Sequence, residues 1–156
     1  MLFRSEHGAD PTVQDKDGWT PLHAASQNGH IGVLQFLVEH GADPTVQNKN
    51  GSTPLHLVSE NGDIDTVRYL VEHGADPTAQ DKDRWTPLHS ASKNGHAEIV
   101  QFLIEHGANL TPHDKDVMTK LWGLRGIWRR TKDMWKSRRS LSNHEPHESS
   151  SSATQV

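Results

Sequence analysis

Cysteine is absent from this sequence of 156 residues, and apolar residues are scarce, at 32%. Without cysteine the chain can form neither a disulfide framework nor a thiolate metal site. Aromatic residues make up only 6%. A single deep hydrophobic core needs more apolar side chains than this composition supplies. The composition therefore favours an elongated architecture in which each layer of structure is thin.

Long hydrophobic stretches are also missing. The densest apolar run is VLQFLV, residues 33–38, which Gln35 interrupts, whereas a membrane-spanning helix needs about 20 apolar residues. The N-terminal residues MLFRSEHGAD lack the apolar stretch of a secretory signal. We therefore expect a soluble, intracellular protein, by default cytoplasmic, with no signal peptide and no transmembrane segment.

The net charge of −4 conceals two parts of opposite sign. Residues 1–116 hold 8 Lys and Arg against 17 Asp and Glu, whereas residues 117–156 hold 8 against 3. The first part is therefore acidic and the second is basic. This change of sign predicts a boundary at about residue 116.

One sequence element occurs three times at intervals of 33 residues. TPLHAASQNGH, beginning at Thr20, returns as TPLHLVSENGD from Thr53 and as TPLHSASKNGH from Thr86. The whole unit starts ten residues earlier each time. It gives full units over 10–42, 43–75 and 76–108, with partial units over 1–9 and 109–116.

Each unit predicts two helices. The Thr before the Pro of TPLH is placed to cap the first helix, and Pro suits the first helical position because no N–H is needed there. This helix should end after about seven residues at Asn-Gly, whose Gly we interpret as a left-handed cap. The second helix carries a broad apolar stripe and ends at His-Gly. The polar segment ADPTVQDKDGW that follows predicts an extended excursion with a tight turn at its tip.

This order of helix, glycine turn, helix and extended turn, with TPLH opening the first helix, resembles the ankyrin repeat. TPLHAA, GH and HGAD carry the resemblance. It implies an all-α solenoid, a stack of antiparallel helix pairs with extended turn loops. It also implies a non-enzymatic scaffold or adaptor for protein–protein interaction, without a cofactor or small-molecule substrate, whose partners are other proteins.

The resemblance further implies that partners bind at the turn tips and on the exposed face of the first helices. The candidate partner-binding residues are the variable positions there: Lys16, Asp17, Trp19, Gln27, Asn28, Lys49, Asn50, Ser52, Glu60, Asn61, Lys82, Asp83, Arg84, Trp85, Lys93 and Asn94. Trp19 and Trp85 stand out because large aromatic residues anchor many interfaces. The alternative, which we favour for either Trp taken singly, is structural packing against the neighbouring turn.

Twelve histidines raise the alternative of a metal site or an enzyme. Two sets recur once per unit: His23, His56 and His89, and His40, His73 and His106. Positions that are translated by one repeat form a ladder, whereas metal ligands converge on one point. The resemblance gives the His of TPLH a structural hydrogen-bonding role. The chain also shows no nucleophile–base pair, phosphate-binding loop or paired-carboxylate motif, so we expect neither catalysis nor a metal.

Residues 117–156 form a basic and then Ser-rich tail, which we expect to be disordered. Within it, KLWGLRGIWRRTKDMWKSRR at residues 120–139 places Leu121, Leu124 and Trp128 on one face of a helix. This pattern favours, as an alternative function, contact with a membrane surface or nucleic acid through the tail. The acidic array itself disfavours binding to duplex DNA.

A second interpretation of the tail concerns the gene. Residues 122–137 can be back-translated into codons, and the resulting nucleotides can be translated again in the frame that starts at the third base of each codon. One permitted choice of codons then gives the sequence GTPWHLASNKGHVEV, which is in register with TPLHSASKNGHAEIV. Some residues in the shifted frame do not depend on the choice of codons, since the codons of Met134 and Trp135 can give only Val. An out-of-frame repeat accounts together for the loss of TPLH, the change of charge and the tryptophans. We favour this hypothesis over a binding tail.

Both ends of the repeat region depart from the pattern. FRSEHGAD aligns with the end of a second helix, and VMTKLW replaces the expected GWTPLH. Repeat arrays normally carry terminal repeats with a polar outer face, so the sequence suggests a piece of a longer array. We expect the second helix over 97–106 to leave its far face uncovered and the repeat ends to promote weak self-association.

Overall fold

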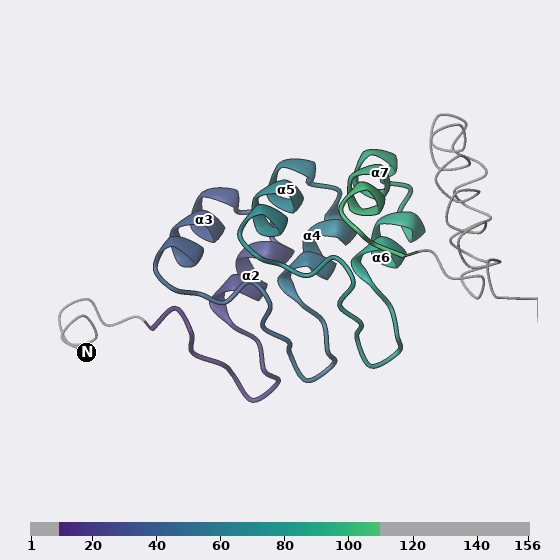
Figure 1. The fold of residues 1–156 in the computed structure, drawn as a ribbon. Coiled ribbons are helices and arrows are strands. Elements are labelled where there is room, and N and C mark those ends of the chain that lie inside the picture. The colour runs from purple at the N-terminus through teal and green to yellow at the C-terminus, as the bar shows by residue number, and fades with distance from the viewer. Residues whose placement is uncertain (1–9, 110–156) are drawn as a thin grey trace, which may run out of the picture.

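The computed structural model describes residues 10–109, which contain six helices (Figure 1). The helices are α2 (Pro21–Gln27), α3 (Ile31–Glu39), α4 (Pro54–Asn61), α5 (Ile64–Glu72), α6 (Pro87–Lys93) and α7 (Ala97–Glu105). Within this range no residue lies in a strand. The predictions made for residues 1–9 and 110–156, among them the binding tail and the out-of-frame repeat, fall outside the described residues.

Successive helices form three pairs that stand side by side in chain order (Figure 1). The first helices α2, α4 and α6 make one row, and the second helices α3, α5 and α7 make another. The long connections project away from the second helices, beyond the row of first helices, and lie next to one another. This arrangement confirms the predicted all-α stack of helix pairs.

The start of each first helix is fixed by the residues TPLH. The Oγ1 atom of Thr20 accepts a hydrogen bond from the backbone N–H of His23, and the ring of His23 accepts one from the N–H of Thr20. Thr53 and His56 repeat this reciprocal arrangement in α4. Two backbone donors that the helix itself cannot satisfy are thereby satisfied at each start.

Helix ends follow the predicted signals. Gly62 caps α4 in the left-handed conformation, with φ of 89°, which a residue with a Cβ atom rarely adopts. The second helices end at a histidine whose Nδ1–H donates to the carbonyl of the aromatic residue four positions earlier. These pairs are His40 with Phe36, His73 with Tyr69 and His106 with Phe102, at 2.7–2.8 Å. Each imidazole also lies against its aromatic ring, with centroids 3.9–4.0 Å apart.

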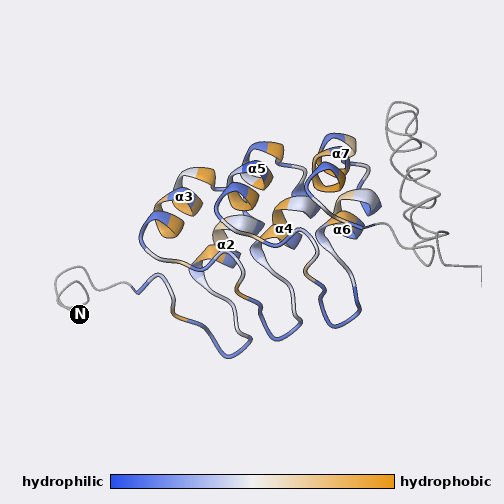
Figure 2. Cartoon of the chain, in the orientation of Figure 1, coloured by the Kyte–Doolittle hydropathy of each residue, from blue (hydrophilic) through white to orange (hydrophobic). Residues whose placement is uncertain are grey.

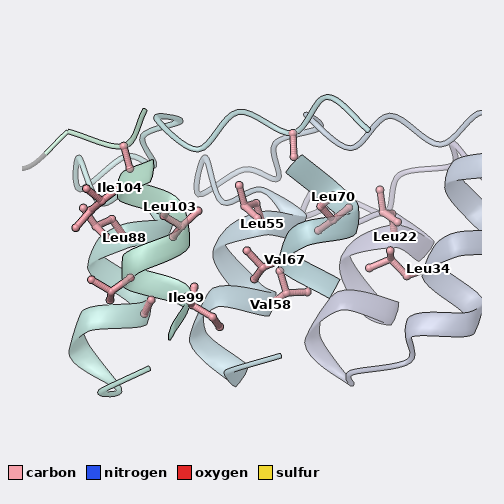
Figure 3. Packing of buried hydrophobic residues seen from close by; sticks show 14 of the residues in the cluster. Leu22, Leu34, Leu55, Val58, Val67, Leu70, Leu88, Ile99, Leu103 and Ile104 are labelled. Carbon is pink, nitrogen blue, oxygen red and sulfur yellow. The ribbon is translucent and has the colours of Figure 1, made fainter. Parts of the chain in front are cut away.

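The core is a continuous row of aliphatic side chains between the two rows of helices (Figure 3). Each first helix contributes one fully buried leucine, namely Leu22, Leu55 or Leu88. The second helices contribute Leu34, Val67, Leu70, Ile99, Val100 and Leu103, each at most 1% exposed. Of the six leucines that recur at equivalent positions, only Leu37, in the first pair, is partly buried. The hydrophobic residues lie mainly in the helices, while the projecting connections are mostly hydrophilic (Figure 2).

The exposed apolar surface lies on α3, at the end of the described stack opposite to α7, where the sequence predicted it. Ile99, Val100, Leu103 and Ile104 of α7 are buried, so the expectation of an uncovered apolar face on this helix was wrong. In α3, by contrast, Val33 is 53% and Phe36 is 58% exposed. At the positions equivalent to Val33, Thr66 and Ile99 are buried, and at those equivalent to Phe36, Tyr69 and Phe102 are partly buried.

Candidate functional site

The long connections end in three turns of the same design, which we call the tips. In the first tip, Asp15 and Trp19 face each other, with the Asp15 N–H donating to the Trp19 carbonyl at 2.9 Å. The carboxylate of Asp15 accepts the N–H groups of Asp17 and Trp19 at 2.8 and 2.9 Å. Asn48 and Asp81 do the same in the second and third tips. A side-chain acceptor thus fixes each turn from inside.

Backbone hydrogen bonds join each tip to the next one. Lys49 N–H donates to the Asp17 carbonyl, and Lys82 N–H donates to the Asn50 carbonyl, both at 2.9 Å. The tips also approach closely, since a Cβ atom at Gly51 would lie 2.9 Å from the Cα of Asp81. The three tips therefore form one rigid row, which is visible along the side opposite the second helices (Figure 1).

Buried histidines hold the bases of the tips. The Nε2 atom of His23 is 3.0 Å from the carbonyl oxygen of Ser52, and that of His56 is 3.0 Å from the carbonyl oxygen of Trp85. A carbonyl only accepts, so Nε2 carries the proton and Nδ1 remains the acceptor for the Thr N–H. Helices α2 and α4 are thereby each tied to the tip of the following repeat.

Burial lowers the pKa of His23 and of His56. The hydrogen bonds to Ser52 and Trp85, and the nearby carboxylates of Asp15 and Asp81, act in the opposite direction. Both imidazoles are consequently held as neutral hydrogen-bonding groups. In this form they link two repeats without placing an unpaired charge in the interior.

The third tip departs from the first two at Arg84. This residue has φ of 66° and is the one non-glycine with positive φ in the described part of the chain. Gly18 and Gly51 hold the equivalent position in the other tips. The adjacent Trp85 is 39% exposed, and Nζ of Lys93 lies 5.4 Å from the centroid of its ring.

Comparison with protein families agrees with this geometry. The model of ankyrin repeats, in three copies, matches residues 1–81 and again residues 41–116. The chain belongs to the ankyrin-repeat family. Ankyrin-repeat domains generally bind other proteins and are typically non-catalytic.

The ankyrin tips display most of the candidate partner-binding residues. Those at the turns are all exposed: Lys16, Asp17, Lys49, Asn50, Lys82, Asp83 and Arg84. At the bases of the tips, Trp19 and Ser52 are partly buried, whereas Trp85 is exposed. The rings of Trp19 and Trp85 lie against His23 and His89, with centroids 5.5 and 5.8 Å apart. Each Trp therefore packs on its own ankyrin repeat and also presents part of its ring to solvent.

The remaining candidates lie at the ends of the ankyrin first helices, where all are exposed: Gln27, Asn28, Glu60, Asn61, Lys93 and Asn94. The three Asn amides are already hydrogen-bonded. Asn28 and Asn94 donate to carbonyls of their own helices, at 2.8 and 3.0 Å. Asn61 instead donates to Ser26 and Gln27 of the preceding repeat, at 3.0 and 2.7 Å. These amides satisfy the open carbonyls of helix ends.

Sequence reasoning omitted one set of residues from this surface. Ala24, Leu57 and Ser90 lie three residues before Gln27, Glu60 and Lys93, and residues three apart share a face of a helix. Ala24 is exposed and the other two are partly buried. They could have been predicted from the sequence, because they lie one helical turn before candidates that were chosen.

Between residues 10 and 109 no group of three or more His, Asp or Glu is placed to hold a metal ion. None of the helices in that range is long and apolar enough to cross a membrane.

Proposed function

We propose that the chain is a non-enzymatic scaffold or adaptor that binds other proteins through its tips and the exposed face of its first helices. The observation that carries this proposal is the hydrogen-bonded row of tips. Lys49 and Lys82 each donate a backbone N–H to the tip before them, so the tip side chains are held at fixed spacing before any partner arrives. Pre-organisation of this kind reduces the entropy lost on binding.

The experiment compares two surfaces of the same protein. Partners are first captured from a cell lysate and identified, and their Kd is then measured with purified full-length chain. Substituting alanine for Lys16, Lys49 and Lys82 together should weaken binding at least about tenfold if the tips are the contact. The control substitutes alanine for Glu39, Glu72 and Glu105, which are exposed on the second helices.

The two variants separate the possible outcomes. A Kd that is unchanged in the lysine variant but weakened in the glutamate variant would move the contact to the second helices and overturn the proposal. Far-UV circular dichroism of both variants confirms that helix content is retained. Neither substitution removes a side chain from the buried core.

We also propose weak self-association through the first end of the stack. Val33 and Phe36 are exposed there, although Thr66 and Ile99, at positions equivalent to Val33, are each 1% exposed. The same surface is thus the packing interface between successive repeats elsewhere in the chain. An apolar face that fits a neighbouring helix pair favours contact with another copy of such a pair.

A further inference from the structure

We propose that Arg84, Trp85 and Lys93 form the principal anchor of the tip surface and that this anchor takes an acidic segment of a partner protein. We call these three residues the third-tip anchor. The inference rests on the proposed function, because it assigns a partner chemistry to one part of the same surface. Three independent observations support it.

The first observation is the backbone of Arg84. Its φ of 66° lies in the left-handed region, which glycine adopts freely and which a residue with a long side chain rarely adopts. At Gly51 a Cβ atom would come within 2.9 Å of the Asp81 backbone, so close packing of the following tip needs glycine. Arg84 gives up the conformational freedom of glycine, and the described residues hold no following tip that would need close packing at this position. A residue kept in such a conformation on an exposed turn points to a role for its side chain.

The second observation is the rigid presentation of Trp85. Its N–H donates to the carboxylate of Asp81 at 2.8 Å, and its carbonyl accepts the Nε2–H of His56 at 3.0 Å. Trp85 is 39% exposed, and Nζ of Lys93 lies 5.4 Å from the centroid of its ring. Trp19, the equivalent residue of the first tip, is less exposed, and Ser52 replaces it in the second. An exposed aromatic ring with a cation beside it suits the centre of an interface.

The third observation is the distribution of charge. Residues 10–109 contain six Lys and Arg, and one of these, Arg68, pairs with Glu98 across the second helices at 3.4 Å. The other five lie on the tips or at the end of α6: Lys16, Lys49, Lys82, Arg84 and Lys93. Three of these five belong to the third repeat.

Most exposed acidic residues lie away from the third tip, although Asp17 of the first tip and Glu60 at the end of α4 are exposed on the proposed partner-binding surface. The second helices carry Glu39, Asp65, Glu72, Glu98 and Glu105. On the third tip, the Asp81 carboxylate accepts two backbone N–H groups, which leaves Asp83 as the exposed acid of that turn. An acidic segment is therefore attracted to the basic residues of the third repeat and repelled by the second helices. The fork of Arg84 also matches a carboxylate.

The chain itself supplies the variants for a test. Gly18 and Gly51 show that Arg84→Gly is compatible with the tip, Ser52 shows the same for Trp85→Ser, and Gln27 shows it for Lys93→Gln. Arg68→Gln is the matched control, because it also removes a cation but does so on the second helices, outside the tips. The probe is a random peptide library displayed on phage and selected on the immobilised full-length chain. Enriched peptides are then synthesised for Kd measurement.

We expect the enriched peptides to be rich in Asp and Glu and to bind less tightly as salt is raised. Arg84→Gly and Trp85→Ser should each weaken their binding about tenfold or more, and Lys93→Gln should weaken it about threefold. Arg68→Gln should change the Kd by less than about twofold. The melting temperature of Arg84→Gly should be unchanged or higher, because a strained residue is replaced by glycine. A residue kept for stability alone would give the opposite change.

The outcomes distinguish this inference from the proposed function. Peptides that bind the tips but are not acidic, or that tolerate Arg84→Gly and Trp85→Ser, overturn the third-tip anchor and leave the scaffold function standing. Peptides whose binding depends only on the second helices contradict both, and so does a failure to enrich any peptide. Random-sequence duplex DNA that binds the chain and loses its affinity in Arg84→Gly would assign the anchor to phosphate, which also overturns the inference.

Discussion

At the scale of single residues, His23 and His56 connect local structure to the assembly of repeats. Each closes the start of its own first helix through Nδ1 and reaches the next tip through Nε2–H. One neutral imidazole thus makes a local cap and a contact between repeats. The charged form would lose the acceptor at Nδ1 and would have to be solvated in a buried position.

This arrangement predicts that stability falls with acid. Burial lowers the folded-state pKa of both histidines below the unfolded value of 6.5, so the folded state binds fewer protons than the unfolded state. Their contribution to stability is complete above about pH 6.5 and is lost as the pH falls from there through the lowered folded pKa values. Urea denaturation between pH 8 and pH 5 measures the effect.

Histidine variants identify the source of that pH dependence. His56→Gln, which does not titrate in this range, should be less stable than the wild type at pH 8 but should lose less stability towards pH 5. His30 is exposed, and His30→Gln should retain the pH dependence of the wild type. Equal flattening in the two variants would refute the assignment to the buried ring.

Ser59 gives a second prediction about single residues. The hydroxyls of Ser26 and Ser92 donate to the carbonyls of Leu22 and Leu88 at 2.7 Å, whereas the equally buried hydroxyl of Ser59 has no hydrogen-bond partner in the described range. Ser26→Ala should cost about 0.5–1.5 kcal/mol of unfolding free energy, while Ser59→Ala should be neutral or stabilising. Urea denaturation measures the free energy of unfolding of the two variants. An equal loss of stability in both would contradict the prediction.

At the scale of the helices, α4 is the element on which the stack depends most. It lies between α2 and α6 in the row of first helices (Figure 1), and its Leu55 is completely buried. Its start is bonded to the third tip through His56. Its end is bonded to the first repeat through Asn61.

Leu55→Ala should therefore destabilise the protein by about 2–5 kcal/mol. The loss should extend to both neighbouring repeats, because repeat stability depends on the interfaces between neighbours. Amide hydrogen exchange, read separately for α2, α4 and α6, measures this spread. Leu57→Ala, in the same helix but partly buried, is the control and should cost less. Increased exchange confined to α4 would contradict a cooperative stack.

The helices themselves were predictable because their signals are local. Thr-Pro at the start and Asn-Gly at the end delimit first helices of seven or eight residues, close to the predicted length. The contacts between repeats were less accessible. Asn61 resembles Asn28 and Asn94 in sequence but bonds to the preceding repeat. The left-handed backbone of Arg84 is likewise set by the tip around it and by no propensity of arginine.

At the scale of the whole molecule, the stack is divided into surfaces of different character. The tips carry most of the basic residues and the second helices are acidic. The first end of the stack exposes Val33 and Phe36. Charge sets the orientation in which partners approach the sides, while apolar area drives contact at the end. Added salt should therefore weaken the binding of partners to the charged sides and leave apolar contact at the end of the stack largely unaffected.

The last prediction concerns that end. Changing Val33→Thr and Phe36→Gln together should reduce concentration-dependent self-association in sedimentation velocity, because less apolar surface is removed from water on contact. The fold should tolerate a threonine at this position, since Thr66 occupies it in α5. Trp85→Ser is the control, because it removes an exposed aromatic ring from the tips and should leave association unchanged. Association that persists in the double variant, or that disappears in the control, would place the contact on another surface. Dissociation by salt alone would likewise show that charge, and not the apolar end, holds the copies together.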